Sequence, residues 1–144
     1  MTYEKLSPAD ITQLLDLMRQ YKRSVGEPPL NPEQKEALQQ AILNGQITYY
    51  ICKNRDNIVA MCSVVIAFSS YTCEPMGIFE DFFISLGFRG RGIARGLTGF
   101  VFEEMKSQNI ASLWIGCAEQ DMDMYKSLGF KTRLGNLLTW SNTP

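Results

Sequence analysis

A ten-residue stretch, FRGRGIARGL at positions 88–97, combines three glycines with three arginines. It follows an apolar segment and leads into a helical pattern. Gly90 and Gly92 lack a Cβ, so the backbone there can approach a ligand closely. A helix that begins near Gly92 points its free N–H groups and positive dipole end back at this turn, which predicts an anion site. The arginines suited to phosphate oxygens in this stretch are Arg89, Arg91 and Arg95.

Two common phosphate loops are excluded by the spacing of this stretch. A Walker loop needs Gly-Lys followed by Ser or Thr, and neither Gly92-Ile93 nor Gly96-Leu97 supplies that pair. The dinucleotide fingerprint GxGxxG fails as well, because Arg95 stands where the last glycine belongs.

The sequence contains no histidine, which excludes Ser-His-Asp and Cys-His catalysis and a His-ligated zinc. No metal is expected, and proton transfer must use carboxylates, tyrosines, thiols, lysines or the backbone. Glu80 in IFEDFF is a carboxylate within an otherwise apolar strand, which is costly unless the residue is exposed, paired or functional. Period-two alternation would put Glu80 and Asp81 on opposite faces, so only one of them can line a cleft unless a bulge intervenes.

The apolar pattern predicts a single domain over residues 1–144, with the order β-α-α-β-β-β-α-β-α-β. Two helices are expected to begin at Ser7-Pro8 and Asn31-Pro32. The other expected elements are strands at 2–6, 47–53, 58–68, 76–86, 112–117 and 137–140, and helices at 93–107 and 118–130. This order predicts an α/β fold in which a mixed, mostly antiparallel central sheet is flanked by helices.

Composition limits the partners and the compartment. The formal net charge of −1 argues against a nucleic-acid footprint, and no apolar run has the length of a membrane span. We interpret the four cysteines, none of them in a CxxC pair, as buried free thiols. Together with the lack of a signal-peptide pattern, this predicts a cytoplasmic protein without membrane partners.

The loop Arg89-Gly90-Arg91-Gly92-Ile93-Ala94 fits (Q/R)xxGx(G/A) and resembles the pyrophosphate-binding loop of the GNAT N-acetyltransferase superfamily, which holds coenzyme A. YKSLGF at 125–130 is similar to the (F/Y)YxxxGF segment of that family. The predicted order of elements also resembles the GNAT fold over essentially the whole chain. The resemblance implies that acetyl-CoA is the co-substrate and that residues 89–95 bind it.

The resemblance also implies roles for single residues. In the family, the strand before the loop splays from its neighbour and pairs with the pantetheine arm, and the matching residues here are Phe82, Phe83 and Ile84. EDFF is similar to the polyamine and diamine N-acetyltransferase branch, where the glutamate at the position of Glu80 serves the acceptor amine through water. Tyr125 matches the tyrosine that protonates the leaving thiolate. Ala118 departs from the pattern, because many members carry there an asparagine that bonds the pantetheine.

The function implied is acetyl transfer from acetyl-CoA to a primary amine by direct attack, with Glu80 as water-mediated base and Tyr125 as acid. Asp81 stays open as an alternative base. We expect a small-molecule acceptor, and a polyamine, an amino acid, an aminoglycoside and a protein N-terminus are all compatible with the residues. The alternative function is a non-catalytic acyl-CoA-binding sensor or partner module, and the resemblance also allows a homodimer.

Overall fold

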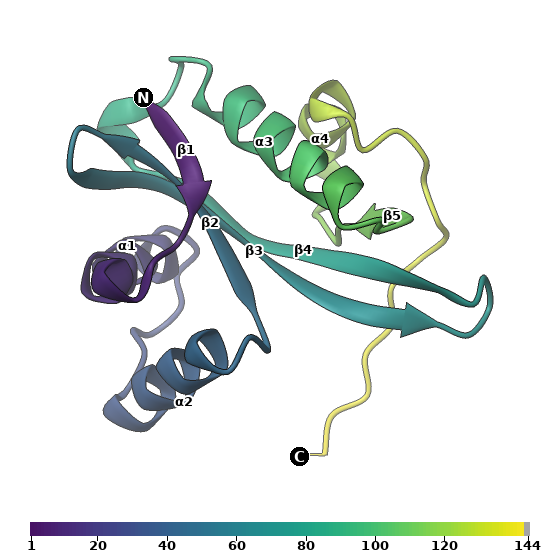
Figure 1. Cartoon of the computed structure of the whole chain (residues 1–144), viewed down its shortest axis with the longest axis horizontal. Coiled ribbons are helices and arrows are strands. Elements are labelled where there is room, and N and C mark those ends of the chain that lie inside the picture. The colour runs from purple at the N-terminus through teal and green to yellow at the C-terminus, as the bar shows by residue number, and fades with distance from the viewer. Residues whose placement is uncertain (143–144) are drawn as a thin grey trace.

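The computed structural model describes residues 1–142 and contains a five-stranded sheet with helices on both faces (Figure 1). Its strands are β1 (Thr2–Lys5), β2 (Thr48–Asn54), β3 (Asn57–Ser69), β4 (Glu74–Ile84) and β5 (Ser112–Trp114). Its helices are α1 (Ile11–Ser24), α2 (Pro32–Leu43), α3 (Ile93–Ser107) and α4 (Met122–Leu128), with short 3₁₀ turns η1 (Pro8–Asp10), η2 (Leu86–Phe88) and η3 (Glu119–Asp121). Within the described chain, no helix is long and apolar enough to cross a membrane.

The strands lie in the sheet in the order of the sequence, β1-β2-β3-β4-β5. The pairs β1–β2, β2–β3 and β3–β4 are antiparallel, whereas β5 runs parallel to β4 after the α3 crossover. This mixed, mostly antiparallel sheet with flanking helices confirms the predicted fold class.

Each face of the sheet has its own apolar core, because alternate residues of a strand point to opposite faces. In β2, Tyr50 and Cys52 pack toward α3, while Tyr49 and Ile51 pack toward α1. The fully buried side chains that the two helices add include Leu14 and Leu17 from α1 and Leu97 and Val101 from α3.

The two predicted helix starts differ in detail. Asn31 caps α2 as expected: its Oδ1 accepts a hydrogen bond from the Gln34 amide at 2.8 Å, and the Gln34 side chain accepts one from the Asn31 amide at 2.9 Å. Ser7 makes no such cap, because its hydroxyl donates to the Asp10 carboxylate at 2.9 Å. The chain passes through η1 first, and α1 begins at Ile11.

The strand predicted at residues 137–140 is not formed. Residues 130–141 have no helix or strand assignment, and Leu137, Leu138 and Trp140 are exposed. A four-residue segment becomes a strand only when a neighbouring strand supplies ladder hydrogen bonds. Here β5, the last strand of the sheet, has only three residues and is paired with β4. The predicted element order therefore holds as far as α4.

A half-buried ion cluster joins the N-terminal elements to β2. The Lys53 ammonium lies 2.7 Å from Asp10 Oδ2 and 2.8 Å from Glu4 Oε1. The side chains of Lys53 and Asp10 are only 18% and 13% exposed, so water screens their attraction weakly. The hydrogen bond from Lys53 holds the pKa of Asp10 below its usual value, and Asp10 followed by Glu4 raises the pKa of Lys53.

We expect Lys53→Met to lower the free energy of unfolding at pH 7 by about 1–3 kcal/mol, because Asp10 loses its cation in a half-buried place. A lowered carboxyl pKa contributes stability above its unfolded value, and that contribution is lost as the pH falls through the folded value. The difference in the free energy of unfolding between Lys53→Met and the wild type should therefore be smaller at about pH 3.5 than at pH 7.

Urea denaturation at the two pH values measures this effect. Lys106→Met is a matched control, because Lys106 pairs with Glu103 at 2.6 Å on a surface where both side chains are 72% exposed. The control should change stability little. Equal effects of the two substitutions would contradict the role given to Lys53.

Candidate active site

The predicted anion loop forms the start of α3. Gly90 and Gly92 take φ angles of +75° and +78°, in the left-handed region that favours glycine, and no atom of residues 1–142 lies within 4 Å of an added Cβ at either residue. Gly92 precedes the first helical residue, Ile93, and no side chain caps the helix. The first N–H groups of α3 therefore face the loop without a helical partner, as an anion site requires.

The three predicted arginines lie on this loop and the first turn of α3, but they differ in their contacts. Arg89 Nε donates to the Ile84 carbonyl at 3.1 Å, and its guanidinium lies 5.6 Å from the centre of the Phe83 ring. Arg91 lies 5.2 Å from the centre of the Phe88 ring. Arg95 is exposed. Arg89 thus fastens the loop to the end of β4, while the other two present charge at the surface.

The third glycine of the stretch has a different role. A Cβ on Gly96 would overlap the ring and hydroxyl of Tyr3 in β1. Gly96 therefore lets α3 pack closely on the first strand, and it belongs to the helix packing rather than to the anion loop.

Beside this loop, β4 separates from β5. The parallel ladder joins Met76, Gly77 and Ile78 to Ser112, Leu113 and Trp114, and it ends there. The predicted strand 112–117 is shorter for the same reason, since residues 115–117 leave the sheet. On this edge, residues 79–84 of β4 have no partner strand within the described chain, and they include the predicted pantetheine-binding residues Phe82, Phe83 and Ile84.

A bulge interrupts β4 in the same segment. Met61 of β3 pairs with Phe83 and Ser63 pairs with Glu80, so β4 has one extra residue between these pairs. Asp81 takes a φ of +54° at this point, which is uncommon for a residue other than glycine.

The bulge brings both carboxylates to the face that α1 covers. Glu80 lies opposite Ser63 in the ladder, and the Ser63 hydroxyl contacts the Asp81 carboxylate. Burial, followed by the negative charges of Asp81 and Glu80, raises the pKa of Tyr21 in α1. Simple alternation would have put Glu80 and Asp81 on opposite faces. The extra residue interrupts the alternation, so both carboxylates lie on the same face. Glu80 is exposed and forms no ion pair among residues 1–142.

Three polar residues that lie near these carboxylates were not predicted from the sequence. The Tyr49 hydroxyl donates to Asp81 Oδ2 at 2.8 Å, and the Ser63 hydroxyl donates to the same oxygen at 3.4 Å. Tyr21 packs on Phe83 with ring centres 5.6 Å apart. Hydroxyl groups inside the apolar runs of β2 and β3 were the available signal, because a buried hydroxyl needs a hydrogen-bond partner.

Tyr125 lies on the opposite side of β4, on the first turns of α4. Its ring is 6.1 Å from that of Phe82 and 6.0 Å from that of Phe130, and Phe130 also packs on Phe79 at 5.2 Å. Burial, followed by the charge of Asp121, raises the pKa of Tyr125 to about 12. The phenol therefore keeps its proton at neutral pH and can donate it.

Gly129 explains the glycine of YKSLGF. Its φ is +124°, and an added Cβ would come within 2.8 Å of the Phe102 ring in α3. The positive φ ends α4, and the close approach brings Phe130 into contact with Phe102, with ring centres 5.3 Å apart. The motif thus holds α4, and Tyr125 with it, against α3 and β4.

The cysteines correct one expectation. Cys52 and Cys62 are buried as predicted, but Cys73 and Cys117 are exposed, because one lies in the β3–β4 turn and the other follows the short β5. Ala118, at the position of the family asparagine, is exposed at the start of η3.

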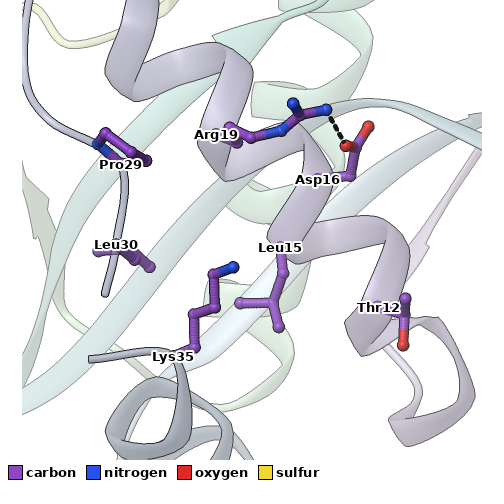
Figure 2. Close-up of a pocket in the computed structure, with 7 residues that line it drawn as sticks. All are labelled: Thr12, Leu15, Asp16, Arg19, Pro29, Leu30 and Lys35. Carbon is purple, nitrogen blue, oxygen red and sulfur yellow. Dashed lines mark hydrogen bonds and ion pairs between the residues drawn. The ribbon is translucent and has the colours of Figure 1, made fainter. Parts of the chain in front are cut away.

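A cavity of about 290 Å³ lies on the other side of α1 (Figure 2). Its walls come from α1, the α1–α2 connection and α2, and none comes from β4, α3 or α4. Figure 2 shows Arg19 turned toward Asp16, with which it forms an ion pair of 2.6 Å. The lining residues are Thr12, Leu15, Asp16, Arg19, Pro29, Leu30 and Lys35. This cavity is separate from the opening in β4.

In residues 1–142, no group of three or more His, Cys, Asp or Glu residues could hold a metal ion.

Residues 11–130 match the family model described as the Acetyltransferase (GNAT) family. The chain belongs to this family. The matched region spans the two carboxylates of β4, the anion loop and Tyr125. No curated protein matches the chain.

Solved acetyltransferase structures share its fold. One is an aminoglycoside acetyltransferase from an uncultured soil metagenomic sample in complex with sisomicin, with a TM-score of 0.86, 13% identity and coverage of 99% of this chain and 96% of that chain. Another is a predicted acetyltransferase from Clostridium acetobutylicum with acetyl-CoA, with a TM-score of 0.80, 20% identity and coverage of 97% and 95%. At these identities the likeness shows the fold alone.

We expect Gly92→Ala to weaken acetyl-CoA binding about tenfold, because an L-residue at this φ costs about 1–2 kcal/mol and the loop shifts to relieve it. Calorimetric titration with acetyl-CoA measures the affinity. Gly45→Ala is the matched control, since Gly45 has a φ of +73° and equally open surroundings at the end of α2. The control should lose similar stability and keep its affinity, and equal affinities of the two variants would contradict the loop assignment.

Proposed function

We propose that this chain transfers the acetyl group of acetyl-CoA to a primary amine of a small molecule by direct attack. The observation that carries the proposal is the opening of β4 beyond Ile78, with Glu80 on one face and Tyr125 against the other. Membership of the GNAT family supports acetyltransferase activity. The structural neighbours with acetyl-CoA and with sisomicin support the classes of donor and acceptor.

The donor side of the proposed site lies on the α3 face. The free N–H groups after Gly92 and the charges of Arg91 and Arg95 suit the pyrophosphate of coenzyme A. The unpaired edge of β4 at Phe82–Ile84 offers backbone groups to the pantetheine arm, in place of the missing partner strand. A backbone N–H of this edge also suits the thioester carbonyl oxygen, where negative charge develops during attack.

The acceptor side lies on the α1 face, where Glu80 handles the proton. A primary amine has a pKa of about 10.4, so it arrives as an ammonium ion and must lose a proton before it can attack. We assign this proton transfer to Glu80 through water, because its exposed carboxylate is not engaged by any described side chain. The amine nitrogen then forms the C–N bond of the amide as the C–S bond of the thioester breaks, and the nitrogen releases its second proton to water.

Tyr125 completes the reaction as the proton donor. The departing thiolate takes the phenolic proton, and the phenol recovers a proton from solvent. The raised pKa of Tyr125 keeps this proton in place at neutral pH. No covalent enzyme intermediate is needed.

The four cysteines of the chain are all free thiols, which supports a reducing compartment such as the cytoplasm.

The direct experiment is an acceptor screen that measures thiol release from acetyl-CoA. The panel should contain polyamines, amino acids, aminoglycosides and a peptide with a free N-terminus. Thiol release that depends on an amine supports the proposal. Tight acetyl-CoA binding without turnover on any amine would instead favour a non-catalytic acyl-CoA-binding module.

We expect Glu80→Gln to lower kcat about 10²-fold at pH 7, because the amide cannot accept the proton. The deficit should shrink above about pH 10, where the amine is already neutral. Glu74→Gln on the same strand is the control, since Glu74 is also exposed and lies far from the bulge. Kinetics that match the wild type at both pH values would exclude Glu80 as the base.

We expect Tyr125→Phe to lower kcat about 10²-fold and to leave the affinity for acetyl-CoA within about threefold, because only the proton donor is removed. A general acid is lost as the pH rises through its pKa, and the Tyr125 pKa is raised to about 12. The wild type should therefore show no loss of kcat between pH 7 and about pH 10, where an ordinary tyrosine begins to titrate. Tyr71→Phe, at a tyrosine that is 96% exposed, is the control. Undiminished turnover of Tyr125→Phe would refute the assignment.

A further inference from the structure

The Arg89 side chain is held on two sides at the end of β4. Its Nε donates a hydrogen bond to the Ile84 carbonyl at 3.1 Å, and its guanidinium carbon lies 5.6 Å from the centre of the Phe83 ring. The Phe83 side chain is buried, and its ring packs on Tyr21 of α1 with ring centres 5.6 Å apart. Arg89 is exposed, yet both of its contacts are with fixed parts of the fold.

The Ile84 carbonyl belongs to the edge of β4 that has no partner strand. In an antiparallel pair, successive residues direct their backbone groups alternately toward the neighbouring strand and away from it. The Ser85 amide donates to the Val59 carbonyl of β3 at 2.8 Å, so the backbone groups of Ile84 point to the other edge. On that edge the ladder with β5 ends at Ile78. Arg89 thus supplies the hydrogen bond that a partner strand would otherwise give.

Side-chain packing does not fix the two glycines that follow Arg89 in the loop. No atom of residues 1–142 lies within 4 Å of a Cβ added at Gly90 or Gly92. Glycine also has more backbone freedom to lose than any other residue. No side chain caps α3, which begins at Ile93. The contacts of Arg89 with β4 therefore tie the start of α3, with its free N–H groups, to the open edge.

We propose that Arg89 is a positioning residue for the donor: its side chain holds the anion loop on β4, and this role needs its Nε–H group more than its positive charge. The inference rests on the proposed function, since the loop matters for turnover only if acetyl-CoA binds there. N–H groups that are already in place lose less conformational freedom when a phosphate binds, so the tether raises the affinity for the donor. The charge itself comes from Arg91 and Arg95.

Glutamine and lysine separate the two properties of Arg89. The side-chain nitrogen of glutamine is as many bonds from Cα as Nε of arginine, so it can donate to the Ile84 carbonyl without carrying a charge. Lysine keeps the charge but has a methylene group at that place, and its ammonium lies one bond further out. The positioning role predicts that Arg89→Gln is the milder change, whereas a role as a phosphate cation predicts the opposite.

Calorimetric titration with acetyl-CoA gives the first test. We expect Arg89→Lys to weaken binding about tenfold and Arg89→Gln to weaken it about threefold at most. Equal affinities of the two variants, or weaker binding by Arg89→Gln, would overturn the proposal.

Arg95 is the matched control, because it is exposed in the first turn of α3 and its guanidinium forms no ion pair within residues 1–142. Here the order should reverse, with Arg95→Gln binding acetyl-CoA more weakly than Arg95→Lys. The same order at both positions would also count against the proposal, since the need for a donor would then not be specific to Arg89.

The free protein gives a second test, without the cofactor. NMR relaxation measures the order parameters of the Gly90 and Gly92 amides. We expect values near about 0.85 in the wild type and in Arg89→Gln, and below about 0.6 in Arg89→Lys. Values that stay high in Arg89→Lys would refute the tether. Failure of the proposed function is distinguishable: the wild type would then not bind acetyl-CoA or would acetylate no amine, while the order parameters still decide whether Arg89 holds the loop.

Discussion

Backbone pairing between β4 and β5 stops at Ile78, and the rest of the site depends on that interruption. Peptide N–H and C=O groups require hydrogen-bond partners, so an unpaired strand edge inside a fold is a place where another chain or a ligand can bind. The β3 ladder holds the other edge of β4 along most of its length. The pairing with β3 therefore holds most of the free segment in an extended conformation, with its other edge open.

The bulge in the same segment determines which polar groups lie on each face of β4. On the α1 face it collects Glu80, Asp81 and the hydroxyl of Tyr49, while the α3 face keeps the ring of Phe82 against Tyr125. In the proposed function, the carboxylate of Glu80 accepts a proton from the amine and the phenol of Tyr125 donates one to the thiolate, so the two groups act on different atoms. Placing them on opposite sides of one strand keeps them apart without any added element.

The glycines around this site have three different structural roles. Gly90 and Gly92 supply left-handed backbone in open surroundings, whereas Gly96 allows a close contact between α3 and Tyr3. Gly129 combines both effects where α4 meets Phe102. The three glycines of FRGRGIARGL look equivalent in the sequence, because no local pattern indicates that β1 lies beside Gly96.

Local patterns in the sequence determined the elements through α4, the class of fold, the anion loop and the resemblance to the GNAT family. They also singled out Glu80 and Tyr125, a carboxylate and a phenol in otherwise apolar surroundings. Only the tertiary structure decided that Glu80 and Asp81 share a face, that Tyr49 and Ser63 hold Asp81, and that residues 137–140 add no strand. The reason is the range of the interactions: Tyr49 and Asp81 are 32 residues apart, and a bulge or a strand exists only relative to the neighbour that pairs with it. Periodicity describes one segment at a time, whereas register joins two.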